Sequence, residues 1–291
     1  MDTKTLQRKI GHGPVLLDGA TGSCLRAAGM PKDAVTERWV LEHPAALEKL
    51  QLAYRQAGCR VLLAPTLQAQ ELVLGPLGYD VEQTNAELVR LTRSVAGQAC
   101  LVAGDLSTLA GSMDSWNEAR SDRMTEIYRR QIGGLLAGGV DFIMAETLLY
   151  PLEAECIAQA AELEGGRTAV CYTFTMQPDG TLFSGQEAGE ILRELERAGA
   201  AAVGFNCVAA GQQLSSLTAK LRRYVRGPLI SKPNAGNPII GPDGMARYPM
   251  GVAEFVRYQL EARQMGATML GGCCGTDPTY LAALGAALSQ Q

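Results

Sequence analysis

The chain has 291 residues, of which 47% are hydrophobic and 19% are charged, and 26 basic and 30 acidic side chains give it a formal net charge of −4. It contains no run of either charge sign, which excludes the electrostatic footprint of a protein that binds nucleic acid or an anionic membrane surface. No apolar stretch approaches the roughly 20 residues needed to cross a bilayer, and the N-terminal sequence MDTKTLQRKIGHG has no signal-peptide core. We therefore expect a cytoplasmic protein with no membrane or nucleic-acid partner.

Cysteine is the unusual component of this composition, with 8 residues against only 2 histidines. In the reducing cytoplasm thiols are kept from pairing, so these cysteines are expected to include metal ligands or a reactive thiol rather than a disulfide framework. Their positions relative to the secondary structure decide which ones.

Short apolar runs alternate with longer segments of helical period along the whole chain. The runs predicted as strands cover residues 15–19, 61–65, 100–106, 141–147, 168–174, 201–207, 228–234 and 267–273. The segments predicted as helices cover residues 44–57, 84–96, 122–137, 151–163, 186–198, 212–226, 252–265 and 278–288. Because the strands are apolar on both faces, they are typical of a parallel sheet covered by helices. Strict alternation without a linker predicts one α/β domain over residues 1–291, a (β/α)8 TIM barrel, with a doubly wound open sheet as the alternative.

In a barrel of this kind the active site forms where the C-terminal ends of the strands open into loops. Polar side chains stand at these strand ends: Asp18, Thr66, Asp105, Glu146, Thr173, Asn206, Cys207, Asn234, Cys273 and Cys274. We therefore expect carboxylates, amides and thiols to converge at one end of the barrel.

Three of these strand-end residues are cysteines. Cys207 ends the sixth predicted strand, Cys273 and Cys274 end the eighth, and both strands neighbour the seventh in a closed barrel. Three protein ligands with an open fourth position are the pattern of a catalytic zinc site, and an all-thiolate set favours a soft ion such as Zn²⁺, one per chain. The other cysteines are expected to be small buried hydrophobes: Cys24, Cys59, Cys100, Cys156 and Cys171.

A vicinal cysteine pair can also be a packing feature, a redox pair or part of a structural metal site. Structural zinc normally has four protein ligands, and no fourth cysteine or histidine ends a strand here. Three thiolates and Zn²⁺ sum to a charge of −1, which suits a bound substrate thiolate better than it suits the generation of hydroxide. We therefore expect thiol alkylation, with a non-catalytic or redox barrel as the alternative.

The segments LLDGATGS (16–23), TLQA (66–69), GVDFIMAET (139–147), GFNC (204–207) and GGCCGT (271–276) resemble those of the homocysteine S-methyltransferases. These are zinc-dependent (β/α)8 barrels that methylate homocysteine to methionine, and the resemblance covers essentially the whole chain. Within the family, PNAGNP (233–238) followed by YPM (248–250) looks most like the homocysteine-binding module of cobalamin-dependent methionine synthase. The resemblance implies that Cys207, Cys273 and Cys274 bind Zn²⁺ and that the substrate thiol joins them.

The resemblance also implies that Asp18 and Glu146 receive the amino group of homocysteine, an ammonium that needs a desolvated carboxylate partner. Asp18 could instead satisfy loop amides, and Asp105 offers a further carboxylate. Asn206 and Asn234 could bind the substrate carboxylate, brace the thiolates or only hold their loops. The predicted substrate-binding residues are Asp18, Thr66, Asp105, Glu146, Asn206 and Asn234.

Two features at the predicted open end have alternative interpretations. Lys232 could meet a substrate carboxylate, or it could only reach solvent. The segment 107–121, which holds Met113 and Trp116, is the longest non-periodic stretch and could be a lid or a docking surface.

The methyl donor can be tested against the residues present. Neither histidine lies in the Asp-x-His-x-x-Gly loop that binds cobalamin, and no G-x-G-x-x-G follows a strand as in a Rossmann-type S-adenosylmethionine site. A sulfonium or betaine donor favours an aromatic cage, whereas aromatic residues make up only 5% of the chain. We therefore expect methylcobalamin on a separate corrinoid protein, since the chain stops at Gln291. S-methylmethionine, S-adenosylmethionine and a betaine are the alternative donors.

The acceptor also has an alternative. Pro65 and Leu67 stand where relatives usually carry a polar and an aromatic residue. Both positions lie at the predicted open end, so a thiol related to homocysteine is the second possible acceptor.

Overall fold

A computed structural model describes residues 1–11, 13–110 and 118–290 of the chain. Eight parallel strands form its central sheet: β1 (Val15–Leu16), β2 (Val61–Leu63), β3 (Leu101–Ser107), β4 (Phe142–Leu148), β5 (Val170–Phe174), β6 (Ala202–Ala209), β7 (Leu229–Asn234) and β10 (Met269–Leu270). Their order is β1-β10-β7-β6-β5-β4-β3-β2, and a parallel bridge between Leu17 and Val61 joins the two ends. The sheet therefore closes into the predicted (β/α)8 barrel, and the alternative of an open sheet is wrong.

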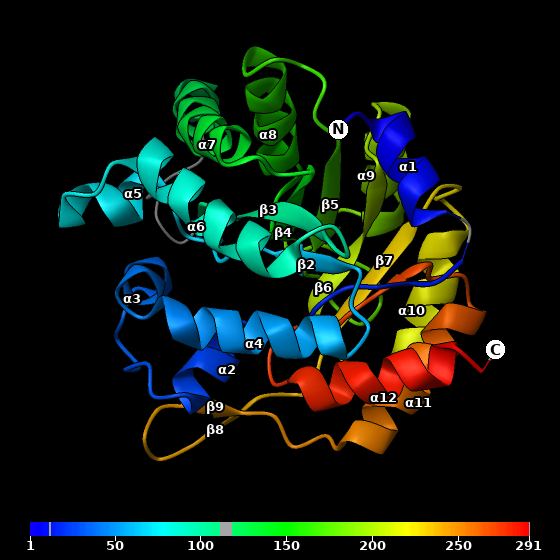
Figure 1. Cartoon of the computed structure of the whole chain (residues 1–291). Helices are drawn as coiled ribbons and strands as arrows, with labels where there is room; N and C mark the ends of the chain where they lie inside the picture. Colours follow the sequence, from blue (N-terminus) through cyan, green and yellow to red (C-terminus); the bar gives the residue numbers. More distant parts are fainter. Residues whose placement is uncertain (12, 111–117, 291) are drawn as a thin grey trace.

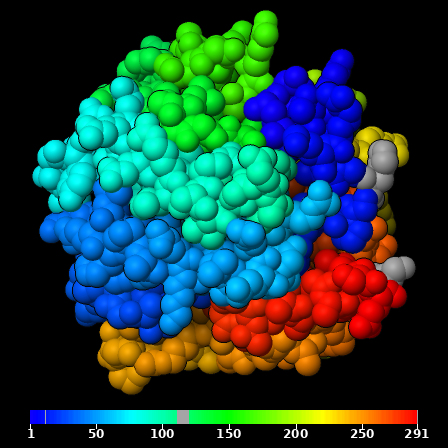
Figure 2. Space-filling model, in the orientation of Figure 1, coloured from blue at the N-terminus to red at the C-terminus, as the bar shows by residue number. Residues whose placement is uncertain are grey.

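The helices predicted between the strands are present and surround the barrel (Figure 1): α4 (Pro44–Gln56), α6 (Val81–Ala96), α7 (Glu118–Gly138), α8 (Pro151–Leu163), α9 (Ala188–Arg197), α10 (Gln213–Arg222), α11 (Val252–Gln264) and α12 (Pro278–Leu288). Helix α6 begins three residues earlier than predicted because Asp80 caps it by accepting a hydrogen bond from the backbone N–H of Gln83. In Figure 2 the segments of α4, α6 and α12 form a continuous cover over one side of the barrel.

Several shorter elements were not predicted from the sequence: α1 (Thr3–Ile10), α2 (Gly22–Ala27), α3 (Thr36–Glu42), α5 (Glu71–Leu74), a 3-10 turn (Gly75–Leu77), and the antiparallel pair β8 (Ile239–Ile240) and β9 (Ala246–Arg247). Helix α1 packs Leu6 and Ile10 against the first residues of the strands, at the N-terminal end of the barrel. The β8–β9 hairpin lies near α2 at the other end of the molecule (Figure 1). These additions therefore close one end of the barrel and build walls around the other.

Apolar side chains on both faces of the strands fill two layers of core. Leu17, Leu63 and Met144 point into the barrel interior, whereas Leu62 and Ile143 pack outward against the helices. This double burial is why the strands are uniformly apolar.

The cysteines predicted to pack in the core do so, with one exception. The buried ones are Cys59, Cys100, Cys156 and Cys171. Cys24 is half-buried, and its Sγ atom lies 3.6 Å from the hydroxyl of Tyr54. Cys24 is therefore not part of the apolar core, because it is partly exposed and contacts a polar group.

No helix in the three described ranges is both long enough and apolar enough to cross a membrane. Met113 and Trp116, the two residues singled out in the predicted lid or docking segment, lie outside the described residues.

Candidate functional site

The three cysteines predicted as metal ligands come together at the C-terminal end of the barrel. Cys207 lies in β6, and Cys273 and Cys274 follow β10. The Sγ atoms of Cys207 and Cys273 are 2.9 Å apart, and all three Sγ atoms lie within 4.8 Å of one another. A tetrahedral Zn²⁺ with Zn–S bonds of about 2.3 Å separates its sulfur ligands by about 3.8 Å, a value between these two distances. The donor set therefore fits one soft metal ion.

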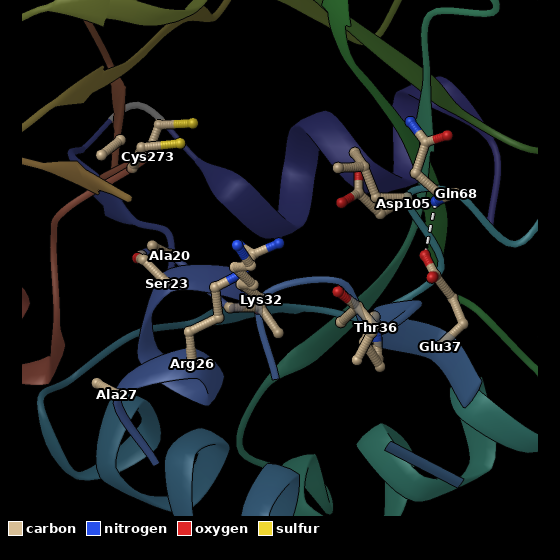
Figure 3. A pocket seen from close by; sticks show the side chains of 18 of the residues that line it. Ala20, Ser23, Arg26, Ala27, Lys32, Thr36, Glu37, Gln68, Asp105 and Cys273 are labelled. Atoms are coloured by element: carbon tan, nitrogen blue, oxygen red, sulfur yellow. Dashed lines mark hydrogen bonds between the residues drawn. The ribbon is translucent and has the colours of Figure 1, made fainter. Parts of the chain in front are cut away.

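The three thiols leave one position of a four-coordinate ion to another ligand. Among the described residues, no histidine, aspartate or glutamate joins their group. Cys273 and Cys274 line a cavity of about 1040 Å³, and Figure 3 shows the Cys273 side chain on one wall of it. A ligand entering the cavity can therefore reach the thiols.

Hydrogen bonds among the thiols favour a single negative charge on the group. Bonds from Cys207 and Cys273 lower the pKa of the Cys274 thiol to about 2, and a bond from the side chain of Tyr248 lowers that pKa further. Hydrogen bonding to Cys207 and Cys274, together with burial, raises the pKa of Cys273. One thiolate flanked by two thiols is thus the preferred state, and it is poised to bind a cation.

Unusual backbone geometry aims the Cys207 side chain. In the described part of the chain, Thr147 (φ 59°) and Cys207 (φ 54°) are the two non-glycine residues with positive φ. The pairings β4–β5 and β6–β7 both shift register around these residues. Such a backbone costs about 1–3 kcal/mol and is found where function requires it. The buried Asn206 stabilises the bend, because its amide donates to Thr147 Oγ1 and accepts from the Thr147 backbone N–H, both at 2.7 Å.

Both predicted asparagines contact the segments that carry the cysteines. Asn234 Nδ2 donates to the carbonyl of Cys207 at 3.1 Å, and Asn234 Oδ1 accepts from the backbone N–H of Cys274 at 3.0 Å. Asn206 also accepts from the Thr173 hydroxyl at 2.9 Å. In this structure the two amides therefore brace the thiol group, which is one of the roles considered for them from the sequence.

A buried cluster of charged residues lies at the base of the same cavity. Asp18, Asp105 and Glu146 are 1%, 7% and 6% exposed, and Lys232 is 2% exposed. The Lys232 ammonium donates to Glu146 Oε1 and lies 4.0 Å from Asp18 Oδ1. Asp18 Oδ2 accepts from the backbone N–H of Leu63 at 2.8 Å. The expectation that Lys232 would only reach solvent is wrong, because carboxylates inside the barrel hold its side chain.

Burial and mutual repulsion set the protonation of this cluster. Burial raises the pKa of Asp18 to about 7, and burial together with the charge of Glu146 raises the pKa of Asp105 well above its usual range. Burial alone would lower the pKa of Lys232, but the charges of the three carboxyl groups outweigh it and raise that pKa. The cluster therefore has more acidic groups than its single cation can neutralise.

The predicted substrate residue Thr66 is fully buried and bonded to the backbone of β3. Its Oγ1 donates to the carbonyl of Asp105 at 2.9 Å and accepts from the Asp105 N–H at 3.0 Å. These bonds fix Asp105, a buried residue that lines the base of the cavity (Figure 3).

The rest of the cavity wall comes from elements that strand-end reasoning could not find. Arg26 extends from α2, Lys32 lies before α3, and Arg247 and Tyr248 belong to the β8–β9 hairpin. Pro65 and Leu67 also line the cavity, as expected; the other residues of this wall include Glu37, whose Oε1 accepts from the backbone N–H of Gln68 at 2.7 Å (Figure 3). The sequence signal for this hairpin is the pair of segments PNAGNP (233–238) and YPM (248–250), which flank it.

Comparison with known proteins places this chain in a family. The family model described as Homocysteine S-methyltransferase matches residues 15–288. The chain belongs to the homocysteine S-methyltransferase family. This is the family expected from the cysteine-bearing motifs.

Members and relatives of this family resemble the chain over most of its length. Methionine synthase of Mycobacterium tuberculosis is 28% identical over 301 residues, which cover 94% of this chain and 24% of that protein. The chain thus spans about a quarter of the length of that synthase. Betaine–homocysteine S-methyltransferase 1 of Mus musculus is 28% identical over 314 residues, which cover 99% of this chain and 75% of that enzyme. The metallated form of homocysteine methyltransferase MmuM from Escherichia coli has the same fold, with a TM-score of 0.80 and 22% identity over 98% of this chain and 100% of that one.

Proposed function

We propose that this chain is a zinc-dependent methyltransferase that binds homocysteine through its thiol and methylates it to methionine. The observation that carries the proposal is that Cys207, Cys273 and Cys274 lie within 4.8 Å of one another beside a large cavity. Membership of the homocysteine S-methyltransferase family supports homocysteine as the methyl acceptor. The buried acidic cluster at the base of the cavity provides partners for the ammonium group of an amino acid.

Cys207, Cys273 and Cys274 would hold the Zn²⁺ ion, which when bound would supply Lewis-acid chemistry that lowers the pKa of the acceptor thiol. The residues of the chain then position the reactants. Asn206 and Asn234 hold the cysteine-bearing backbone, and the acidic cluster orients the amino acid. The acceptor sulfur forms a bond to the methyl carbon while the bond between donor and methyl breaks, and its electron pair stays with the donor. No general base is needed in this step, so the rate depends on positioning.

For the donor, we infer methylcobalamin carried on a separate corrinoid protein that docks over the open end of the barrel. The similarity to methionine synthase supports this donor. The sequence holds no Asp-x-His-x-x-Gly loop, so the corrinoid would have to be held outside this chain.

A small donor molecule is the second candidate, and the size of the cavity favours it. At about 1040 Å³, the cavity is slightly larger than the roughly 300–1,000 Å³ typical of small-molecule sites. This volume is more than one amino-acid thiol fills. Its outer wall includes the cationic side chains of Arg26 and Lys32 (Figure 3), which suit the carboxylate of S-methylmethionine, S-adenosylmethionine or a betaine. The similarity to a betaine–homocysteine S-methyltransferase agrees with this class of donor.

One experiment on a single sample tests both proposals. The purified protein is analysed for zinc and then incubated with homocysteine and, separately, methylcobalamin, S-methylmethionine, betaine or S-adenosylmethionine, and methionine is quantified. We expect about one zinc per chain, lost in Cys274→Ala and kept in the control Cys24→Ala, whose thiol is outside the ligand group. Methionine from methylcobalamin supports the corrinoid donor, and methionine from a small donor alone overturns it. A folded protein without zinc would overturn the whole proposal in favour of the non-catalytic or redox barrel.

A further inference from the structure

We propose that Gln259 is a positioning residue for the metal site: from a helix outside the barrel, it holds the backbone that leads into Cys273 and Cys274. This inference rests on the proposed zinc site and deepens it, because it assigns a role to a residue that does not line the cavity. The role follows from the hydrogen bonds that the side-chain amide of Gln259 makes where β7 and β10 end.

A proline interrupts the hydrogen-bond ladder just before the two cysteines. Strand β10 is parallel to β7, and the chain keeps this register beyond the strand. The Gly271 N–H donates to the Ser231 carbonyl at 3.0 Å, and two residues later the Cys273 N–H donates to the carbonyl of residue 233 at 2.8 Å. In this parallel pattern the Gly271 carbonyl would accept from the N–H of residue 233. Residue 233 is proline and has no N–H, so the Gly271 carbonyl needs another donor.

Gln259 supplies this donor. It lies in α11 and is fully buried. Its Nε2 donates to the Gly271 carbonyl at 2.5 Å and to the Ser231 carbonyl at 3.2 Å. The Ser231 hydroxyl donates to Gln259 Oε1 at 2.9 Å, which sets the direction in which the amide faces. Because a buried carbonyl without a donor is costly, the side chain replaces the bond that the proline removes.

The bond lies two residues before the first ligand of the GGCCG segment. The N–H groups of Gly272, Cys273 and Cys274 are all held by hydrogen bonds to flanking segments, and Gln259 holds the carbonyl at the start of this stretch. Gly271 and Gly272 have no side chains to restrict their backbone angles. Without Gln259 the peptide between them can rotate toward another donor, and this rotation would move Cys273 and Cys274 relative to Cys207.

A second buried glutamine separates this role from general stabilisation of the barrel. Gln51 in α4 is also buried, and its Nε2 donates to the carbonyl of Leu63 at the end of β2 at 3.0 Å. Strand β2 carries none of the three thiols. Gln51→Met and Gln259→Met therefore remove the same kind of bond, but only Gln259→Met does so next to metal ligands. Both variants should unfold at a lower urea concentration than the wild type when zinc is absent.

The test measures the zinc dissociation constant of the full chain by competition with a chromogenic chelator. Gln259→Met should raise this constant by about tenfold or more, as is typical of groups that orient metal ligands. Gln51→Met should leave it unchanged. In Co²⁺-loaded protein, the visible absorption bands depend on the arrangement of the ligands. These bands should shift in Gln259→Met and stay in place in Gln51→Met.

Restoring the missing backbone donor should reverse the effect. Pro233→Ala gives residue 233 an N–H that can pair with the Gly271 carbonyl. The double variant Gln259→Met/Pro233→Ala should therefore recover most of the zinc affinity that Gln259→Met loses. If it recovers none, the explanation through the interrupted ladder is wrong.

The remaining outcomes decide between the inference and the proposed function. An unchanged zinc dissociation constant in Gln259→Met, or an equal increase in Gln51→Met, overturns the inference and leaves the zinc site in place. If Gln259→Met does not fold, Ser231→Ala decides, because it removes the hydroxyl that orients the Gln259 amide. It should also weaken zinc binding, and an unchanged constant overturns the inference. If the folded wild type binds no zinc, the inference and the proposed function both fail.

Discussion

The side-chain oxygen of Asn234 accepts a hydrogen bond of 3.0 Å from the backbone N–H of Cys274. The amide nitrogen of the same side chain donates to the carbonyl of Cys207 at 3.1 Å. Because β7 lies between β6 and β10 in the sheet, this one residue ties together the two segments that carry the three thiols. It therefore sets the distance between ligands that are 67 residues apart in the chain.

Replacing this bridge should weaken metal binding without removing a ligand. We expect Asn234→Ala to lower the affinity for zinc by about tenfold or more, since groups that orient metal ligands typically contribute 10–100-fold. Competition with a chromogenic chelator measures the change. Asn237→Ala is the control, because Asn237 is exposed three residues further on. Equal zinc affinity in the two variants would contradict the bridging role.

The fold was predictable because its determinants are local. Strands with apolar side chains on both faces, such as the one containing Leu62 and Leu63, repeat at regular intervals between amphipathic helices, and this alternation has few solutions other than a barrel. Cysteines at the ends of the sixth and eighth strands could then be placed together, since the barrel rule brings strand ends to one mouth. The position of the thiol group therefore needed no tertiary information.

The partners of Lys232 and Asn234 could not be predicted in the same way. The ion pair of Lys232 depends on which side chains from β1, β3 and β4 point into the barrel at the same level, and this is decided by strand register rather than by neighbouring residues. The β8–β9 hairpin was missed because its strands have two residues each and Ile239 and Ile240 are exposed. A pair of strands this short leaves no periodic pattern to detect.

Tyr248, from that hairpin, should control the protonation of a predicted ligand. Its side chain hydrogen-bonds to Cys274 and lowers the pKa of that thiol. In zinc-free, reduced protein, Tyr248→Phe should therefore shift the pH dependence of Cys274 alkylation by iodoacetamide to higher pH, because less thiolate is present at a given pH. Mass spectrometry of the labelled peptide gives the rate, and Tyr79→Phe serves as the control. An unshifted profile would show that the hydroxyl does not stabilise the thiolate.

Gly271 should be required for the packing of β10 against the end of β1. A Cβ atom at this position would lie 2.8 Å from Leu17 Cβ and 2.9 Å from the carbonyl oxygen of Asp18. We expect Gly271→Ala to lower the free energy of unfolding by about 1–3 kcal/mol, the usual cost of overpacking a close-packed interior. In Gly13→Ala the added Cβ has no atom within 4 Å, so urea unfolding should show a change within about 0.5 kcal/mol. Similar losses in both variants would refute the steric explanation.

The acidic cluster should make the zinc-free protein less stable as the pH rises from about 4 to about 7. The pKa of Asp18 is raised by burial to about 7 in the folded protein, against about 3.9 in an unfolded chain. Between these values the folded state holds a proton that the unfolded state has released, so the free energy of unfolding falls with increasing pH. The raised pKa of Asp105 acts in the same direction. Lys232 does not change the pH dependence of the free energy of unfolding in this range, because its ammonium group is charged in both the folded and the unfolded state.

Urea unfolding of the wild type and of Asp18→Asn at several pH values isolates this contribution. The asparagine oxygen can still accept from the backbone N–H of Leu63, which Asp18 Oδ2 does at 2.8 Å, while the titrating group is removed. The stability of Asp18→Asn relative to the wild type should therefore increase as the pH rises from about 4 to about 7. If the two proteins instead lose or gain stability in parallel over this range, Asp18 does not carry a raised pKa, and the cluster is ionised differently from the arrangement around Lys232 described above.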